Sequence, residues 1–163
     1  MHPHNRTLTI ITAALLLLAL AIAPAAAFSG AGSGTQADPY IITTPAELQA
    51  INDDLSAHYK LGNDIDLSDF DWVPIAFSGH NDFSSIYFSG SLDGDGHKIS
   101  NLQIANSQLS TSKFYGLISS ANGASFSSIW LDGFDIKNTG AVPSNIRIYL
   151  AGLAVHATNC NLR

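Results

Sequence analysis

The pattern of apolar and polar positions changes twice along the chain. An almost unbroken apolar stretch runs from Leu8 to Ile22, and residues 28–38 then contain mostly Gly, Ser and Ala. From Tyr59 onward, short runs place apolar residues at every second position and are separated by Gly, Asn, Asp and Ser. Alternation with period two predicts short β-strands joined by tight turns. The apolar residues of these runs are Tyr59, Leu61, Ile65, Leu67, Phe88, Leu92, Ile99, Leu102 and Ile104.

One segment has the signals of a helix start. Thr44 is a good N-cap residue, Pro45 follows at the first helical position, and Glu47 lies three residues after Thr44. This arrangement is a capping box, in which the two side chains bond each other's backbone N–H groups. The sequence predicts a short helix over residues 45–54 that covers one end of the sheet.

The strands that follow have no helical segments between them, so the sheet is either antiparallel or coiled. Two internal matches favour a solenoid. "ISNLQI" from Ile99 resembles "FSSIWL" from Phe126 at an offset of 27, and "YGLISSANGASF" resembles "AGLAVHATNCNL" at an offset of 36. The second match aligns Gly116 with Gly152 and Ala124 with Cys160.

The chain stops at Arg163 inside such a coil, because Leu162 aligns with the start of the strand at Phe126. An uncovered last coil would expose backbone groups and apolar side chains. Residues 39–163 are therefore predicted to be the N-terminal part of a longer solenoid, truncated at the C-terminus. We also expect self-association through the open coil end.

The N-terminus has the features of a secretory signal peptide. Arg6 precedes the apolar stretch, and Ala25-Ala26-Ala27 offers a small-residue cleavage site. The alternative is a retained anchor, but the stretch is short for a membrane span. We therefore assign residues 1–27 to a signal peptide and residues 28–38 to a flexible lead-in.

Composition narrows the partners of the mature chain. Its 136 residues carry 13 acidic and 6 basic side chains, for a formal charge of −7, which argues against nucleic acid and anionic membranes. One cysteine, Cys160, excludes a disulfide framework. The length fits one domain with a hydrophobic core.

Several stretches together resemble a known class of surface proteins: "FSGAGSGTQADPYIITTPAELQAI", "HYKLGNDIDLS", "FSGSLDGDGHKISNLQI" and "YGLI". In this order they are similar to the opening module of adhesin-like proteins that carry GLUG motifs. A similar module occurs beside the catalytic part of the M26 family of immunoglobulin A-cleaving metallopeptidases. The resemblance implies an all-β, right-handed parallel β-helix with one short N-terminal capping helix, and an extracellular structural or adhesive role.

Four carboxylates are candidates for a calcium site: Asp64, Asp66, Asp93 and Asp95. Calcium prefers several oxygen ligands on a tight turn. However, the twelfth residue from Asp93 is Ile104 and not the glutamate of an EF-hand, and Asp-Gly is a strong turn dipeptide. We therefore interpret residues 93–97 as a turn, with calcium as the weaker alternative and no other cofactor.

A glycosidase or lyase needs two carboxyl groups across a groove. The same four aspartates are the only plausible sources of such a pair. Basic residues that would hold an acidic polysaccharide are scattered. The zinc motif H-E-x-x-H is absent, since the single glutamate is Glu47. We therefore predict no catalytic residues and no enzymatic activity.

Other side chains with chemical potential have simpler interpretations. Trp130 lies between two inward-facing positions, so its ring is expected to point outward as a possible ligand contact. Trp72 is expected to be buried, Cys160 to be a small core residue, and His58, His80 and His156 to lie on the surface.

The sequence thus predicts a secreted or cell-surface, non-enzymatic scaffold or adhesin-like binding module, with an extracellular protein or glycan as partner and no membrane span after cleavage. The alternatives are a carbohydrate-active β-helix and the non-catalytic flank of a large exported peptidase.

Overall fold

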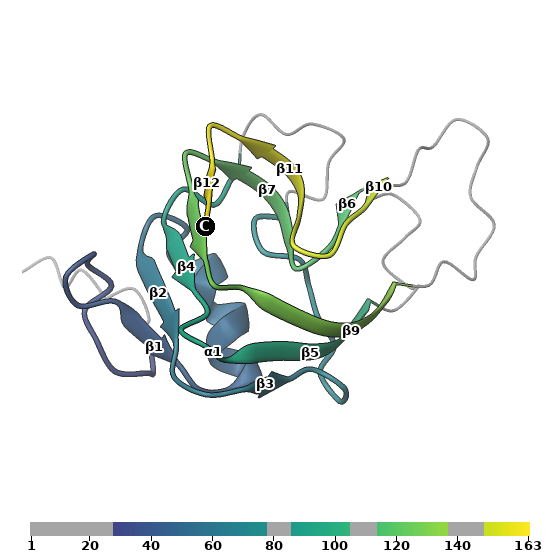
Figure 1. The fold of residues 1–163 in the computed structure, drawn as a ribbon, viewed down its shortest axis with the longest axis horizontal. Helices are drawn as coiled ribbons and strands as arrows, with labels where there is room; N and C mark the ends of the chain where they lie inside the picture. Colours follow the sequence, from purple (N-terminus) through teal and green to yellow (C-terminus); the bar gives the residue numbers. More distant parts are fainter. Residues whose placement is uncertain (1–27, 78–85, 105–113, 137–148) are drawn as a thin grey trace, which may run out of the picture.

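The computed structural model describes residues 28–77, 86–104, 114–136 and 149–163 (Figure 1). The predicted signal peptide, residues 1–27, lies outside this range. The described chain is mostly strand, with one short α-helix. The strands are β1 (Tyr40–Ile42), β2 (His58–Leu61), β3 (Ile65–Asp66), β4 (Ser91–Asp93), β5 (Lys98–Ile104), β6 (Phe114–Tyr115), β7 (Ile118–Asn122), β8 (Ser125–Ser127), β9 (Trp130–Ile136), β10 (Tyr149–Leu150), β11 (Ala154–Thr158) and β12 (Asn161–Leu162).

The predicted capping box is confirmed. The backbone N–H of Glu47 donates to Oγ1 of Thr44 at 3.2 Å, and the N–H of Thr44 donates to Oε2 of Glu47 at 3.1 Å. The α-helix, α1, is shorter than expected: it covers Pro45–Gln49 and continues as the 3₁₀ helix η1 over Ala50–Asp53. Its apolar residues Leu48 and Ile51 are fully buried against the core.

Every strand pair is parallel. The strands form a five-stranded sheet in the order β1-β2-β4-β8-β12, a three-stranded sheet β3-β5-β9, and the two-stranded sheets β11-β7 and β10-β6. Paired strands lie far apart in the sequence, as shown by His58 and Ser91, which are 33 residues apart and are Cα partners. Parallel pairing at this distance requires a long connection between neighbouring strands.

The prediction of a right-handed parallel β-helix is wrong as stated. The described strands make four separate small sheets, and the described residues complete no closed coil. Between β8 and β9 and between β11 and β12 the backbone turns into the left-handed region at non-glycine residues, Ser128 and Asn159, and the chain passes there from one sheet to another. Period-two alternation predicts strands and their inward faces, but it does not say whether hydrogen bonding continues from one sheet to the next.

In-register stacking builds the core. In the five-stranded sheet, Tyr59, Leu92 and Phe126 are Cα partners in successive strands, and each is at most 2% exposed. Phe88 packs between these positions, with its ring centroid 6.3 Å from that of Tyr59 and 5.8 Å from that of Phe126. The alternating pattern predicts that Phe88 and Leu92 point into the core, and the structure confirms this. Ile99, Leu102 and Ile104 are buried in the core as well.

The structure confirms one of the two sequence repeats and contradicts the other. The match at an offset of 36 is confirmed, because Ile118 pairs with Ala154 and Phe126 pairs with Leu162. The match at an offset of 27 is wrong. Ile99 pairs with Leu131, and Phe126 stacks on Leu92. Both alignments place apolar residues on apolar residues, so the sequence pattern cannot distinguish these registers.

Residues 28–38 contain bends but no helix or strand. This segment lies along the first strand: the N–H of Ile41 donates to the carbonyl of Ala31 at 2.8 Å. The N–H of His58 donates to the carbonyl of Gly34 at 2.9 Å. The Phe28 ring packs on Tyr40, with 4.6 Å between centroids. The lead-in thus covers the outer side of β1, while its predicted flexibility stays a prediction.

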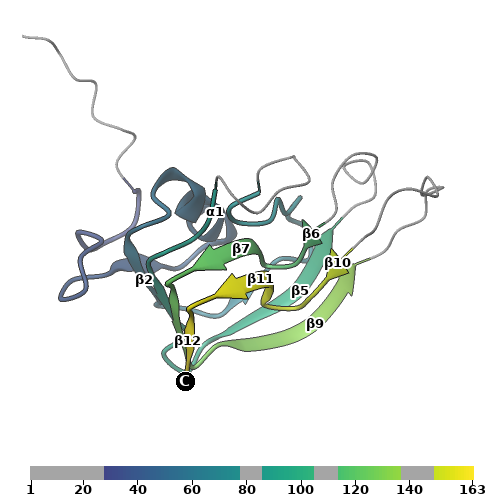
Figure 2. The same ribbon diagram turned by 90° about the horizontal axis from the view of Figure 1, so that it is seen from above.

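Figure 2 shows how these elements are layered. The helix α1 lies on one side of the sheets, and β9, β11 and β12 lie on the other. The core between them is therefore covered by a helix at one end and bounded by edge strands at the other.

We expect the substitution Thr44→Ala to lower the free energy of unfolding by about 1 kcal/mol, because it removes the acceptor for the N–H of Glu47. Urea denaturation would measure this loss, with Thr158→Ala, at an exposed threonine outside the cap, as the control. Equal losses for Thr44→Ala and Thr158→Ala would contradict the capping role.

The carboxylate of Glu47 makes the stability of the cap depend on pH. Burial opposes the ionisation of Glu47, but hydrogen bonds from Thr43 and Thr44 lower its pKa below the usual value. A group with a lowered pKa contributes stability at neutral pH that is lost as the pH falls through this pKa, so the contribution of Glu47 to the free energy of unfolding should decline in acid.

Candidate functional site

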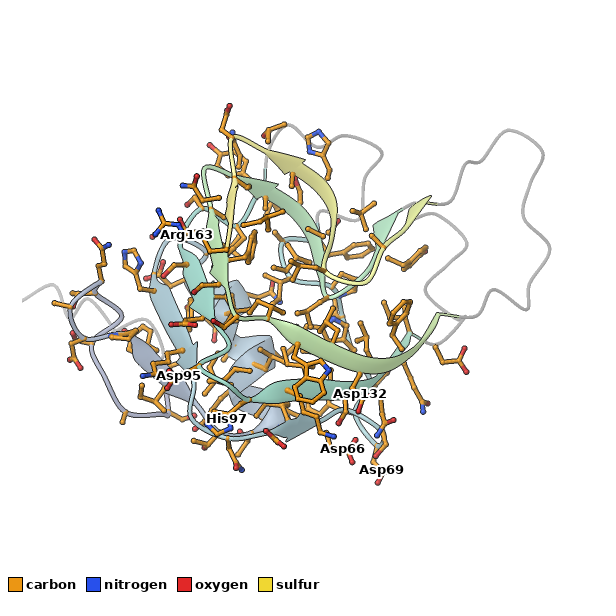
Figure 3. All side chains as sticks on the ribbon, in the orientation of Figure 1. Asp66, Asp69, Asp95, His97, Asp132 and Arg163 are labelled. Atoms are coloured by element: carbon orange, nitrogen blue, oxygen red, sulfur yellow. The ribbon has the colours of Figure 1, made fainter. Side chains whose placement is uncertain are left out.

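The three-stranded sheet β3-β5-β9 carries charged, amide and aromatic side chains on its outward face. Register places Trp130 beside Lys98, and it places Asp66 and Asp132 on either side of Ser100. We call the outward group Asp64, Asp66, Lys98, Trp130 and Asp132 the Trp130 face. Figure 3 shows Asp66 and Asp132 on this outer side, with Asp95 and His97 further along the same side.

Trp130 is the exposed aromatic centre of this face. Its side chain points outward, as predicted from the sequence, and 60% of the residue is exposed. The Lys98 ammonium lies 5.9 Å from the centroid of its ring and 3.2 Å from Oδ2 of Asp132. A cation over an indole face is attracted by the ring quadrupole. Lys98 therefore holds the indole and the carboxylate next to each other.

Asp64 and Asp66 are held as carboxylates. The backbone N–H of Lys98 donates to Asp64 at 3.2 Å, and together with nearby His97 this lowers the pKa of Asp64. The Asn101 amide donates to Asp66 at 3.0 Å, and with the N–H of Ser68 it lowers the pKa of Asp66. A general acid needs a raised pKa at neutral pH. Neither carboxyl is suited to the acid role in glycoside hydrolysis.

Residues 93–97 form a turn, as interpreted from the sequence. The N–H of Asp95 donates to Oδ1 of Asp93 at 3.1 Å, and the N–H of His97 donates to the carbonyl of Gly94 at 2.8 Å. Asp95 and Gly96 both have positive φ, 46° and 84°. The Asp95 carboxylate lies outside the turn, in an ion pair with Lys60 at 2.7 Å.

The structure does not gather the four calcium candidates into one cluster. Each carboxylate has its own protein partners. Asp64 accepts from the backbone N–H of Lys98 and lies 3.3 Å from Nδ1 of His97. Asp66 accepts from Asn101 and Ser68, Asp93 accepts from the N–H of Asp95, and Asp95 forms an ion pair with Lys60. Among the described residues, no group of three or more His, Cys, Asp or Glu side chains could hold a metal ion.

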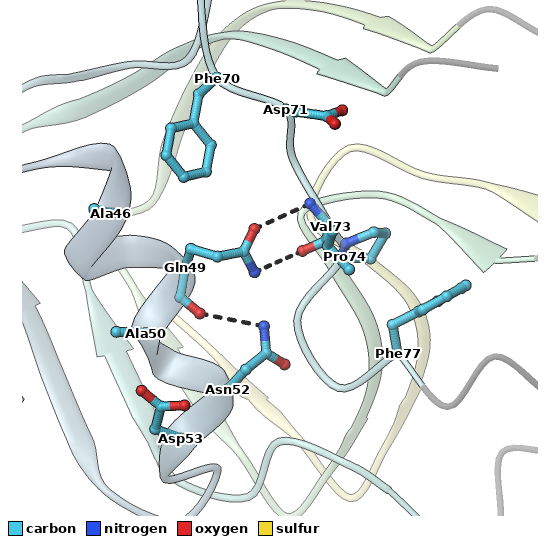
Figure 4. Close-up of a pocket in the computed structure, with 10 residues that line it drawn as sticks. All are labelled: Ala46, Gln49, Ala50, Asn52, Asp53, Phe70, Asp71, Val73, Pro74 and Phe77. Atoms are coloured by element: carbon cyan, nitrogen blue, oxygen red, sulfur yellow. Dashed lines mark hydrogen bonds between the residues drawn. The ribbon is translucent and has the colours of Figure 1, made fainter. Parts of the chain in front are cut away.

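A second feature, an open cleft of about 610 Å³, lies between α1–η1 and residues 70–77 (Figure 4). The Gln49 amide donates to the carbonyl of Val73 at 2.9 Å and accepts from its N–H at 3.0 Å. Asn52 accepts from the N–H of Ala76 at 2.9 Å. Both amides are thus engaged in holding the loop. The carboxylates that also line the cleft, Asp53 and Asp71, lie on opposite sides of it in Figure 4.

Sequence reasoning missed this cleft. Its one local signal is the pair of amide residues Gln49 and Asn52, three positions apart on the helix. Helical residues three apart lie on the same side, so this pair could have been recognised as a possible contact for a loop.

The remaining candidates have structural contacts. Trp72 is 2% exposed, and its indole nitrogen has no hydrogen-bond partner among the described residues. Cys160 is half-buried, packs against the core, and points its thiol at the carbonyl of Thr158 at 3.2 Å. His58 lies 2.8 Å from the Ser91 hydroxyl. His80 lies outside the described residues.

The chain is similar to a very large protein. Halomucin of Haloquadratum walsbyi is 36% identical over an alignment of 129 residues, and the alignment covers 72% of this chain. The chain spans about 1% of the length of Halomucin. No protein-family model matches the chain, and no solved structure shows a significant likeness to it.

This likeness to Halomucin supports the predicted class of exported or surface protein. Within the described ranges, none of the helices has the length and apolar character to cross a bilayer.

We expect two glycine substitutions in the turn to differ sharply. A Cβ at Gly94 would overlap the carbonyl of Ser128, so Gly94→Ala must shift backbone and should cost about 3 kcal/mol of stability. A Cβ at Gly96 meets nothing within 4 Å, so Gly96→Ala should cost only about 1–2 kcal/mol for its positive φ. Chemical denaturation of both variants measures the difference, and equal costs would contradict the close approach at Gly94.

We expect the melting temperature to be the same in excess calcium and in excess chelator, because protein donors already hold each candidate carboxylate separately. Thermal unfolding followed by circular dichroism measures this. A rise of several degrees with calcium, lost in Asp93→Asn, would restore the calcium interpretation of the turn.

Proposed function

We propose that this chain serves as a non-enzymatic binding module of an exported surface protein, and that it contacts a glycan through the Trp130 face. Two likenesses support the surface role: the similarity to Halomucin and the resemblance to the opening module of proteins with GLUG motifs. The observation that carries the proposal is the indole of Trp130, 60% exposed on a paired strand between polar side chains.

The geometry suits a sugar ring. An indole offers a large apolar surface at little cost in side-chain entropy, which is why aromatic residues dominate binding contacts. A sugar can place its C–H groups on such a surface and its hydroxyl groups on neighbouring polar side chains. The Asp132 carboxylate and the Lys98 ammonium, 3.2 Å apart, provide an acceptor and a donor beside the indole.

The charge of the face favours a neutral glycan. Three carboxylates, Asp64, Asp66 and Asp132, accompany one ammonium, that of Lys98. Exposed aspartate side chains are ordinarily ionised at neutral pH, and the pKa values of Asp64 and Asp66 lie below the usual value. An acidic polysaccharide would be repelled by this excess negative charge.

The fold supports display of this face. Trp130 and Lys98 lie on adjacent strands that are fixed by the ladder between β5 and β9. Inward residues of the same sheet, Ile65 and Ile99, are 1% exposed. A ligand contact on a packed sheet keeps its geometry without paying for loop ordering.

We expect the protein to bind dextran, a neutral glucan, more tightly than polygalacturonate, an acidic one. Trp130→Ala should weaken dextran binding about 30-fold, the loss typical of an aromatic contact at the centre of an interface. Affinity electrophoresis or calorimetry measures both. Tyr87→Ala is the matched control, since Tyr87 is 41% exposed and lies outside the Trp130 face.

Tight binding of polygalacturonate, or equal effects of Trp130→Ala and Tyr87→Ala, would contradict the proposal. Absence of binding to neutral glycans, together with capture of a surface protein that is lost in Trp130→Ala, would show that the face binds protein instead.

A further inference from the structure

The cleft between α1–η1 and residues 70–77 has no part in the proposed glycan contact (Figure 4). The Trp130 face belongs to the sheet β3-β5-β9, so the two features lie on different elements. The volume of the cleft, about 610 Å³, lies within the range of ligand sites, roughly 300–1,000 Å³. Most of the side chains that line it are apolar, namely Ala46, Ala50, Phe70, Val73, Pro74 and Phe77.

Side-chain amides fix the shape of this cleft. Gln49 bonds both backbone groups of Val73, at 2.9 and 3.0 Å, and Asn52 accepts from the N–H of Ala76 at 2.9 Å. Ala76 is 1% exposed and has a φ of 56°, a conformation that is unfavourable for alanine and persists where the surroundings enforce it. A ligand therefore meets a formed surface and loses little affinity to ordering of the loop.

Two carboxylates of the cleft have no cation beside them in the described structure. Asp53 and Asp71 are exposed and lie on opposite sides of the cleft. Within the described ranges, neither side chain takes part in a hydrogen bond or an ion pair. Lys60 and Lys98 pair with carboxylates outside the cleft, and the lining contains no basic residue. The described cleft therefore has a negative charge that a cationic ligand would neutralise.

Asp53 also lies at an unusual place for a carboxylate. It is the last residue of η1, at the end of the helical segment where free carbonyl groups favour a cation. No basic residue occupies the last turn of α1 or of η1. The next residue, Asp54, has a structural role, because it accepts from the N–H and the hydroxyl of Ser56 at 3.0 and 2.7 Å. A cation bound at Asp53 would meet both its carboxylate and the end of the helix.

The arrangement favours an organic cation over a metal ion. Calcium and magnesium need several oxygen ligands around one point, whereas Asp53 and Asp71 lie on opposite sides of the cleft. Lysine and arginine side chains place an apolar stem along an apolar surface and carry their charge at the tip. Arginine also stacks on aromatic rings, which Phe70 and Phe77 provide. Two basic side chains, one for each carboxylate, would use both sides of the cleft.

The open form of the cleft favours a peptide over a small molecule. A site for a small molecule usually buries about 70–90% of the ligand surface, which an open cleft does not do. An extended peptide keeps one face on the protein and the other in solvent, and its residues i, i+2 and i+4 share one face.

From these observations we infer that the cleft binds an extended segment of a partner protein, in which two basic side chains flank an apolar one on the same face. One basic side chain pairs with Asp53 and the other with Asp71, and the apolar side chain contacts Phe70 and Val73. The positive charge of the segment is complementary to the formal charge of this chain, −6. This inference does not depend on the glycan proposal.

The test is the binding of a pentapeptide with blocked ends, Arg-Ser-Leu-Ser-Arg, to the full chain, measured by isothermal titration calorimetry. The peptide should bind, whereas Glu-Ser-Leu-Ser-Glu should not, because its charges oppose those of the cleft. The peptide Ser-Arg-Leu-Arg-Ser has the same composition but places its leucine on the face opposite to the arginines. It should bind about fivefold more weakly, because the leucine stays in solvent.

Charge-neutralising variants locate the contact. Asp53→Asn and Asp71→Asn should each weaken binding of Arg-Ser-Leu-Ser-Arg about fivefold, the effect of one exposed ion pair. The double variant should weaken it about 25-fold, because separated sites contribute independently. Asp38→Asn is the matched control, since it removes the same charge from an exposed residue of the lead-in, outside the cleft. Far-ultraviolet circular dichroism checks that all variants remain folded.

Absence of peptide binding, or equal losses for Asp38→Asn and the cleft variants, would overturn the inference. Equal binding of Ser-Arg-Leu-Arg-Ser would show that charge alone is recognised and would reject the extended segment. Spermidine that binds as tightly as the peptide, with a loss in Asp53→Asn, would replace the protein segment with a small organic cation. Trp130→Ala should leave peptide binding unchanged, so failure of this inference and failure of the glycan proposal are separate results.

Discussion

The in-register parallel ladder is the constraint on which the rest of this structure depends. It places Tyr59, Leu92 and Phe126 in one buried column and adds the Phe88 ring between them. Because each strand has only two to seven residues, no strand could bury enough apolar surface by itself. The core exists only when strands that are distant in the sequence stack with apolar residue on apolar residue.

The same ladder places left-handed backbone at matching positions of paired strands. Asn101 and Gly133 lie inside β5 and β9, directly after a pair of Cα partners, and have φ values of 55° and 63°. Gly123 and Asn159 lie at corners directly after β7 and β11, with φ values of 73° and 53°. Glycine and asparagine are the residues that tolerate the left-handed region best. The Asp-Gly pairs at residues 93–96 belong to this group of corners and give the fold its shape.

Stacking outside the core follows from stacking inside it. Once Ile99 lies beside Leu131, Lys98 must lie beside Trp130 and Ser100 beside Asp132. The positions of the side chains on the Trp130 face thus follow from the strand register that the core requires. The burial of Phe126 has the same origin, since Leu92 and Leu162 are its Cα partners on the two neighbouring strands.

The sequence by itself determined the local features. The capping box, the positions of short strands, the inward residues from Phe88 to Ile104, the Asp-Gly turn and the outward direction of Trp130 all depend on a few neighbouring residues, and the structure contains them. Tertiary structure alone decided the rest: the pairing of Ile99 with Leu131, the division into four sheets, the cleft held by Gln49, and the separate partners of the four candidate carboxylates. The reason is that several registers satisfy an alternating pattern equally well, and the choice among them depends on hydrogen bonds and packing between residues more than twenty positions apart.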